Sequence, residues 1–428
     1  LKMKNLKTLF LFACVSMLTF SCTNQESLIE YVPVVETITK IVTVEAETAT
    51  PETQTVGSGG ITFIDDAQTW TNDRIWIMDG KVVVRAGGVL NIEAGTIIKA
   101  ENGSGVDATV LVIGKGGQIN AIGTADAPII FTDIDDEISY ADKGLSPNRV
   151  PSDMGKWGSI VVLGNAAVGT DAGTADIEGI ATGYDWTTYG GSDDADNSGS
   201  LSYVSIRHSG QEIGGGDELQ GLTLGGVGSG TLIENIEIVG SNDDGIEIFG
   251  GSVNVNNLFI YYNGDDGIDL DQAYKGTIQN AVVVMHSSTD NVFEFDGTED
   301  STGTNDGAFT VKDVTAYGHP SAEKSDTYGH WKSDATCFTS NVVYLDFVGG
   351  TFIEGIDMDT YAGVGTAAVE GSLLFSELYF VSSDAIETIF SATSVTDFDT
   401  FAKVVDQQAD GTGADETVFT WTLHARGE

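Results

Sequence analysis

The sequence repeats itself in its middle, and this internal repeat restricts the fold more than any other feature. The strings NDDGIEIFGG, GDDGIDLD and DNVFEFD are copies of one motif in which Asp243, Asp265 and Asp290 occupy equivalent positions, 22 and 25 residues apart. A second string recurs in the same phase, at 234–241, 256–263 and 279–286. Repeats of this length indicate a fold in which each unit packs mainly on its neighbours, such as a solenoid.

Each unit of the repeat has the composition of short strands joined by tight turns. Runs rich in Ile, Val and Phe favour strands, and the Gly, Asn and Asp residues between them favour turns. Apolar and polar residues alternate within many runs, as in half-buried strands. Leucine-rich repeats would need a Leu scaffold, and a propeller blade would need about 40 residues. The pattern therefore predicts an all-β fold, a right-handed parallel β-helix.

The composition agrees with stacked coils and also restricts the ligands. The chain has 54 Gly to form corners and only 6 Pro, a residue that would interrupt strand ladders. It carries 64 Asp and Glu against 19 Lys and Arg, a formal net charge of −45 at pH 7. Because nucleic acid is bound mainly by Lys and Arg that displace counterions, this balance excludes nucleic acid as a partner. Neutral glycans, cationic partners and ligands bridged by Ca²⁺ remain.

The N-terminus has the features of an export signal. Lys2, Lys4 and Lys7 precede a short apolar run that ends at Ser21, immediately before Cys22. Such a run is too short to span a bilayer as a helix and is typical of a secretory signal. We expect residues 1–21 to be a signal peptide and residues 22–58, rich in Thr, Glu and Val, to be an extended tether.

The remaining residues, 59–428, are expected to form the β-helix. Two polar stretches, at 133–154 and 184–199, are expected to be loop insertions. The final string FTWTLHARGE is expected to cap the open end of the coil stack, which would otherwise be a template for aggregation. One repeated corner carries an asparagine, which we expect to bond the backbone of adjacent coils, at Asn235, Asn257, Asn280 and Asn341.

Several of these strings resemble a known family. The segments DGKVVVRAGGVLNIEAGTIIKA, GKWGSIVVLGNA and LQGLTLGGVGSGTLIENIEIVGSNDDGIEIFGG resemble right-handed parallel β-helix surface lipoproteins of the Bacteroidota type. The string LTFSC around Cys22 resembles the lipobox of bacterial lipoproteins, although an ordinary secretory signal is the alternative. The resemblance implies export, lipidation of Cys22 and anchoring at the outer membrane with exposure on the cell surface. Some members of that family are called transporters, but we expect no membrane-spanning segment after residue 21 of this sequence.

A narrower resemblance concerns chemistry. The string NDDGIEI (242–248) resembles the NTDGIDI signature of polygalacturonase-like glycoside hydrolases, and the next copy resembles their paired-Asp motif. The resemblance implies Asp244, Asp265 and Asp266 as catalytic carboxylates, one as acid and two holding the water. The later Gly-His-Gly and Arg-Ile-Lys motifs of that family are missing, and no Lys or Arg follows His286 until Lys312. The sequence thus lacks the cationic motif with which that family would hold a uronate.

The stacked acidic residues could instead bind a metal ion. Asp and Gly are ordinary turn residues, so a purely structural role is the alternative. Carboxylates at equivalent positions of adjacent coils repel one another, and Ca²⁺, which prefers several oxygen ligands, would relieve that repulsion. The candidate ligands are Asp243, Asp265, Asp290, Glu247, Asp269 and Glu294.

Three other features could carry function. The aromatic residues Tyr184, Trp186 and Tyr189 could stack on the sugar rings of a glycan, or could pack a loop onto the coils. Arg207 follows a strand and could suggest the basic residue of a pectate lyase, but a polar strand end is commoner. Cys337 lies in an apolar run and is expected to be a small buried residue.

These observations favour a lipid-anchored surface protein over an enzyme. The leading hypothesis is a β-helix that binds a polysaccharide or a surface protein, with Ca²⁺ as its only suggested cofactor. The second hypothesis is a glycoside hydrolase, and the third is a structural component of the envelope or of an adhesin. A full set of acid, base and cation would favour the enzyme, and the sequence offers only half of that set.

Overall fold

The structure is a computed structural model. It describes residues 52–180, 182–213, 218–301, 307–319, 328–331, 335–347, 361–363, 373–390 and 397–427. These residues all belong to one compact unit. The expected signal peptide, Cys22 and most of the expected tether lie outside the described residues, so the predictions about them stay predictions.

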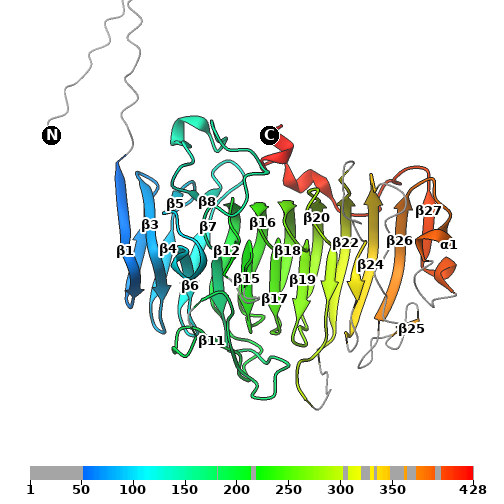
Figure 1. The fold of residues 1–428 in the computed structure, drawn as a ribbon, viewed down its shortest axis with the longest axis horizontal. Coiled ribbons are helices and arrows are strands. Elements are labelled where there is room, and N and C mark those ends of the chain that lie inside the picture. The colour runs from blue at the N-terminus through cyan, green and yellow to red at the C-terminus, as the bar shows by residue number, and fades with distance from the viewer. Residues whose placement is uncertain are drawn as a thin grey trace, which may run out of the picture. The chain divides into compact units, whose positions relative to one another are not determined.

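The strands form three parallel ladders along a stack of coils (Figure 1). The first ladder holds β2 (Ala67–Trp70), β4 (Val89–Ile92), β7 (Gln118–Ile122) and the first halves of the long strands β12 (Gly199–Arg207), β16 (Leu232–Ser241), β18 (Asn254–Asn263), β20 (Thr277–Val284), β22 (Phe309–Tyr317), β24 (Cys337–Leu345) and β26 (Leu373–Val381). The second ladder holds the first halves of β1 (Thr53–Ile64) and β3 (Ile75–Val84), then β5 (Ile97–Ala100), β8 (Ile129–Asp133), the second halves of the long strands and β27 (Ala402–Val405).

The third ladder completes each coil. It holds the second halves of β1 and β3, then β6 (Val110–Ile113), β9 (Ile160–Leu163), β15 (Leu222–Gly225), β17 (Ile246–Phe249), β19 (Ile268–Asp271), β21 (Phe293–Phe295) and β23 (His330–Trp331). A further strand, β25 (Tyr361–Gly363), pairs with β26. This arrangement confirms the predicted parallel β-helix. The first coil begins at Thr53, within the segment that we expected to be tether up to residue 58.

The long strands bend from the first ladder into the second at a single residue with left-handed backbone. The φ values of these residues lie between 52° and 62°, at Tyr203, Asn235, Asn257, Asn280, Asp313, Asn341 and Glu377. Asn and Asp tolerate this conformation better than other residues with a side chain. Asn257 Nδ2 donates to Asn235 Oδ1 at 3.0 Å, and Asn280 Nδ2 donates to Asn257 Oδ1 at 2.8 Å. The asparagines therefore bond one another from coil to coil, whereas we expected bonds to the backbone of adjacent coils.

The inward side chains of all three ladders form one continuous core. Equivalent residues of successive coils stack directly, as in the register of Ile246 on Ile268 and of Ile268 on Phe293. All three are fully buried. In the later coils the core is aromatic, with Phe295 and Trp331 in edge-to-face contact at 6.1 Å between ring centroids.

The two insertions pack on the outer surface of the coils. The first, residues 134–159 with the 3₁₀ turn η2 (Tyr140–Asp142), places Ile138 against outward side chains of β3, β5 and β8. The second is longer than the expected 184–199, since it occupies all residues between β9 and β12. It contains the small antiparallel pair β10 (Ala175–Asp176) and β11 (Thr188–Tyr189) and covers outward residues of β6 and β9. Two smaller elements, η1 (Gly105–Asp107) and the pair β13 (Gln211–Glu212) and β14 (Glu218–Leu219), also lie between ladder strands.

We expected the C-terminal residues to cap the open end of the coil stack. Instead, they run back along the side of the stack. After α1 (Ile386–Ile389), η3 (Phe398–Thr400) and β27, residues 406–427 form a segment that we call the C-terminal strap, with 3₁₀ turns η4 (Glu416–Phe419) and η5 (His424–Arg426) (Figure 1). Asp415 N donates to Asn280 Oδ1 at 2.6 Å, and Leu423 N donates to Glu237 Oε1 at 2.5 Å.

The strap has a physical reason to lie there. Phe259 of β18 and Val282 of β20 point away from the core, and Phe419 covers both of them. The ring centroids of Phe259 and Phe419 are 5.3 Å apart. Burial of this outer apolar stripe stabilises the strap on the side of the coils, because apolar surface is removed from water.

Candidate functional site

The candidate site begins with a column of polar side chains on the outer face of the third ladder. The register of β15, β17, β19, β21 and β23 aligns Thr223, Glu247, Asp269, Glu294 and His330. Such positions would ordinarily face water. Here Glu247 and Asp269 are buried, because turn residues and the second insertion surround them.

The turns that precede these strands carry the second set of carboxylates. Asp244, Asp266 and Asn291 are equivalent, and the two aspartate side chains reach toward the next coil. Asp244 Oδ1 accepts a hydrogen bond from the backbone N–H of Asp266 at 2.8 Å, and Asp266 Oδ1 accepts one from that of Asn291 at 2.8 Å. These aspartates therefore connect successive coils, which is the structural role that turn chemistry predicts.

Column and turns together form two carboxylate groups. Oxygen atoms of Asp244, Glu247 and Asp269 all lie within 4.8 Å of one another, and so do oxygens of Asp244, Asp265 and Asp266. In the first group the exposed fractions are only 5%, 6% and 8%. Glu247 Oε2 is buried and has no hydrogen-bond partner among the described residues. A buried carboxylate oxygen without a donor is costly unless a proton or a cation compensates it.

The electrostatics of these groups follow from burial and from mutual repulsion. Burial raises the pKa of Asp244 well above its usual value, and neighbouring carboxylates raise it further. The pKa of Glu247 is raised in the same way, by burial first and then by Asp269. Burial and Glu294 raise the pKa of Asp266. Burial also raises the pKa of Asp243 to about 7, with a further contribution from Asp265. Burial and mutual repulsion therefore both disfavour the fully ionised state of these carboxylates.

The sequence located this site but assigned its members incompletely. Glu247 and Asp269 come together as expected, and Asp265 belongs to the second group. Asp244 belongs to both groups, whereas its neighbour Asp243, which we had expected to join Glu247 and Asp269, is a member of neither among the described residues. Among the described residues, Asp290 and Glu294 join neither group.

Glu294 contacts Asp266 of the second group and also the next coil. Its Oε1 lies 3.3 Å from His330 Nδ1, its partner in the register of β21 and β23. Asp290 donates its backbone N–H to the carbonyl of Asp265 at 2.8 Å. The column of acids therefore ends at Glu294, two coils beyond Glu247, and His330 follows in the next coil.

The expected catalytic residues are close together but are not all open to a substrate. Asp265 is exposed, whereas Asp244 and Asp266 are 5% and 2% exposed. Both buried aspartates also use an oxygen to hold the backbone of the next coil. A polysaccharide would reach Asp265 directly and the other two only after rearrangement of the turns.

The expected aromatic binding surface is mostly internal. Trp186 and Tyr189 are 4% and 2% exposed and pack between the second insertion and the third ladder. Only Tyr184 is exposed, and its ring stacks on Trp186 at 5.4 Å between centroids. Trp186 and Tyr189 therefore have the alternative role, which is to pack a loop onto the coils.

Arg207 and Cys337 both have structural surroundings. Arg207 is 1% exposed, donates to the carbonyl of Gly144 at 2.7 Å and lies 3.9 Å from the buried carboxylate of Glu237. It is therefore not available as a base for a lyase. Cys337 is fully buried, as expected, and burial raises the pKa of its thiol to about 12.

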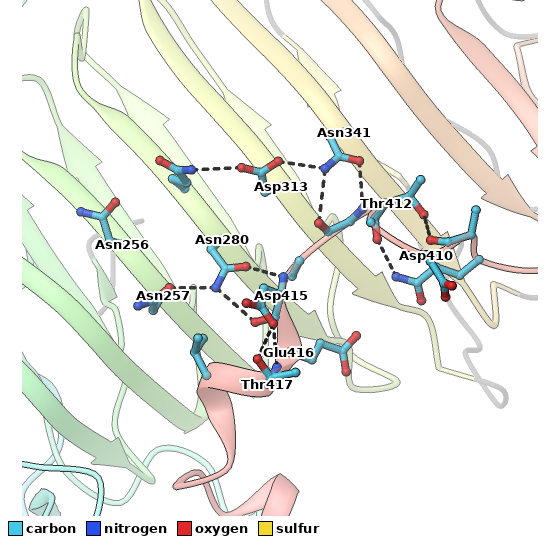
Figure 2. Close-up of a pocket in the computed structure, with 17 residues that line it drawn as sticks. Asn256, Asn257, Asn280, Asp313, Asn341, Asp410, Thr412, Asp415, Glu416 and Thr417 are labelled. Atoms are coloured by element: carbon cyan, nitrogen blue, oxygen red, sulfur yellow. Dashed lines mark hydrogen bonds between the residues drawn. The ribbon is translucent and has the colours of Figure 1, made fainter.

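Sequence reasoning missed the polar groove between the strap and the long strands. Figure 2 shows Asn257, Asn280 and Asn341 facing the strap across this groove of about 820 Å³. Asn341 Oδ1 accepts from Gly413 N at 2.9 Å, so the groove's amides already bond the strap. The string NNLFIYYN contained a signal for it, because its apolar residues do not alternate with polar ones. A strand that is apolar on both faces is expected to be covered by other segments on both faces.

The comparisons with known proteins agree with this fold. Residues 62–425 match the model of a pectate-lyase-like β-helix domain family. Among curated proteins and among solved structures, no chain matches this one. Among the described residues, no helix has the length and apolar character needed to cross a membrane. Because the match extends over nearly all of the coil stack, the chain belongs to the pectate-lyase-like β-helix domain family.

Proposed function

We propose that this protein is a calcium-binding β-helix that serves as a binding module rather than as an enzyme. The observation that carries the proposal is the group of Asp244, Glu247 and Asp269, whose oxygens lie within 4.8 Å of one another although the residues are buried. Ca²⁺ prefers several carboxylate and carbonyl oxygens in a flexible geometry, and a group of carboxylates supplies them. Glu247 Oε2, without a hydrogen-bond partner among the described residues, is available for coordination.

The second carboxylate group gives the module its contact with a ligand. Asp265 is exposed and lies with Asp244 at the edge of the buried group. A cation held there can complete its coordination with hydroxyl groups of a glycan or with carbonyl groups of a partner protein, as Ca²⁺ accepts six to eight oxygens. Cation and ligand would then bind together on an otherwise strongly acidic surface.

Calorimetry and thermal unfolding test the calcium proposal. We expect CaCl₂ added to chelator-treated protein to release or absorb heat and to raise Tm, because a ligand that binds only the folded state stabilises it. Glu247→Gln should lose most of this response and should have a higher calcium-free Tm than wild type, since Gln is neutral at this buried position without taking up a proton. Asp290→Asn is the matched control, an acid-to-amide change outside both groups, and should respond as wild type does. Wild-type protein that shows neither heat nor a shift in Tm would remove calcium from the proposal.

A glycoside hydrolase is the second candidate, supported by the proximity of Asp244, Asp265 and Asp266. Hydrolysis of a glycoside needs two carboxylates across the bond, one as acid. A reducing-sugar assay over neutral and acidic glycans should then detect product with wild type and lose it with Asp265→Asn. Equal signals from the two proteins would end this candidate and would leave the calcium proposal untouched.

We also propose that the module is anchored at the outer membrane, on the cell surface, by lipid on Cys22. The support is the basic stub, the apolar run and Ser21 before Cys22. Two or more acyl chains suffice for stable anchoring. Labelled palmitate should enter the wild-type protein but not Cys22→Ala, and equal labelling of the two would contradict the anchor.

A further inference from the structure

A second pocket lies where the first insertion meets the C-terminal strap. Its lining residues are far in sequence from those of the carboxylate groups. Its apolar floor includes Ile97 of β5 and Ile130 of β8, each 3% exposed. Tyr140 and Lys143 of the first insertion form one side, and Trp421 and Arg426 of the strap form another. The cavity has a volume of about 490 Å³. This size is within the range of small-molecule sites in proteins, about 300–1,000 Å³.

The pocket joins two cations that are far apart in the chain. The guanidinium of Arg426 donates to the backbone carbonyl of Lys143, 283 residues away. That bond fixes the guanidinium beside the lysine, whose own backbone is left-handed at φ 53°. Figure 1 shows the C-terminal segment reaching the loops that follow β8.

The charge of this lining is opposite to that of the whole protein. Among the lining residues only Asp126 is acidic, whereas the chain has a net charge of −45. Among the described residues, no carboxylate forms an ion pair with Lys143 or Arg426, although Arg149 pairs with Asp133 close by. The carboxylate of Glu237 interacts electrostatically with Arg426. It already accepts hydrogen bonds from the hydroxyl of Ser205 and from the backbone N–H of Leu423. Lys143 and Arg426 against Asp126 thus give the pocket a net positive lining, which attracts an anion.

The rest of the pocket indicates what carries that anion. The two isoleucines and the ring of Tyr140 offer an apolar surface next to the cations. Trp421 is 4% exposed and lines another side of the pocket with its ring, and its buried Nε1 has no hydrogen-bond partner among the described residues. We propose that this pocket binds a small ligand with one carboxylate on a ring, the carboxylate between Lys143 and Arg426 and the ring against Tyr140 and the isoleucines. This site is independent of the calcium proposal, because it shares no residue with the carboxylate groups.

Titration calorimetry of the full chain tests the site with three probes. Sodium glucuronate presents a carboxylate on a sugar ring, glucose is its neutral counterpart, and cyclohexanecarboxylate presents the carboxylate on an apolar ring. We expect saturable binding of glucuronate or cyclohexanecarboxylate, at least tenfold weaker binding of glucose, and weaker binding of the acids as NaCl is raised, because salt screens exposed charges. The tighter of the two acids identifies the ring as sugar or apolar. Equal affinity for glucose and glucuronate, or no saturable binding of either acid, would overturn the proposal.

Variants then assign the binding to this pocket. Lys143→Gln is the decisive change, because no described hydrogen bond involves its side chain, and the variant is expected to fold normally. It should weaken binding of the tighter acid at least tenfold, and Arg426→Gln should do the same. Lys403→Gln, at an exposed lysine of β27, is the matched control and should bind as wild type does. Wild-type affinity in Lys143→Gln, with wild-type melting, would show that the acid binds elsewhere and would overturn the assignment.

Discussion

At the scale of the residue, a structural role and the proposed binding role fall on the same side chains. Asp244 accepts the backbone N–H of the next coil and also belongs to both carboxylate groups. The sequence presented turn chemistry and metal binding as alternatives for the acidic turns, with Asp243 as the candidate ligand and Asp244 as a catalytic candidate. For Asp244 a structural role and the proposed calcium binding are compatible, because a carboxylate offers two oxygens and about four lone pairs. The turn holds the carboxylate of Asp244 at a defined height in the stack.

A buried histidine gives a prediction at the same scale. Burial lowers the pKa of His208 to about 4, and its Nδ1 lies 2.7 Å from the carbonyl of Asp153. Because the folded pKa lies below the unfolded value, the unfolded chain takes up a proton first as the pH falls. We therefore expect the folded state to lose about 3 kcal/mol between about pH 6.5 and about pH 4 through this residue.

The test compares wild type with His208→Asn, since Asn tolerates the left-handed backbone at this position, where φ is 60°. Urea unfolding at pH 7 and at pH 4 gives the loss of unfolding free energy for each protein. The loss should be about 3 kcal/mol smaller in the variant. An equal loss in both proteins would mean that His208 does not carry this part of the pH dependence.

At the scale of the element, the outer segments matter as much as the ladders. The first insertion, the second insertion and the strap each bury outward apolar residues of different strands. A bare coil would expose those residues to water. The outer segments therefore complete the packing of the ladders, and the pocket between the first insertion and the strap results from two of them meeting.

The strap should be held mainly by one aromatic side chain. Phe419 is 2% exposed and covers Phe259 and Val282. We expect Phe419→Ala to weaken strap docking by about 3 kcal/mol, the usual cost of removing a buried ring. Limited proteolysis read by mass spectrometry should then show faster cleavage within residues 406–427. Val418→Ala, at the adjacent and partly buried position, should be cleaved nearly as slowly as wild type, and equal rates for all three proteins would contradict this role of Phe419.

At the scale of the whole molecule, the coil stack makes stability a sum of neighbouring contacts. Each described ladder strand pairs with the coil before and the coil after it, apart from those at the ends. In such repeat folds a local defect affects the adjacent units first. The negative charge is likewise distributed along the coils, since the acids recur in the same register.

A core substitution tests this distribution. Phe293 is fully buried at the centre of a late coil, and Phe293→Ala should cost about 3–5 kcal/mol because the cavity cannot close completely. Hydrogen exchange followed by mass spectrometry should show faster exchange in β19, β21 and β23. Exchange in β2 to β5 should match wild type, and a uniform increase along the chain would instead indicate one cooperative unit.

The sequence by itself determined the coil stack and the approximate place of the acidic site. Spacing of 22 and 25 residues and strand alternation are local properties, and stacking in register is the main way for such units to bury their apolar faces. The asparagine corner was predictable for the same reason, because one repeated backbone conformation selects one residue type.

Only the tertiary structure decided which of two adjacent aspartates, Asp243 or Asp244, enters both carboxylate groups. A turn has no period-2 rule, so its side-chain directions follow from packing on the next coil. Likewise, the outward Phe259 did not reveal that a strap covers it, and nothing local connects Lys143 with Arg426. These contacts join segments far apart in the chain, and their free energy exists only once the coils have brought those segments together.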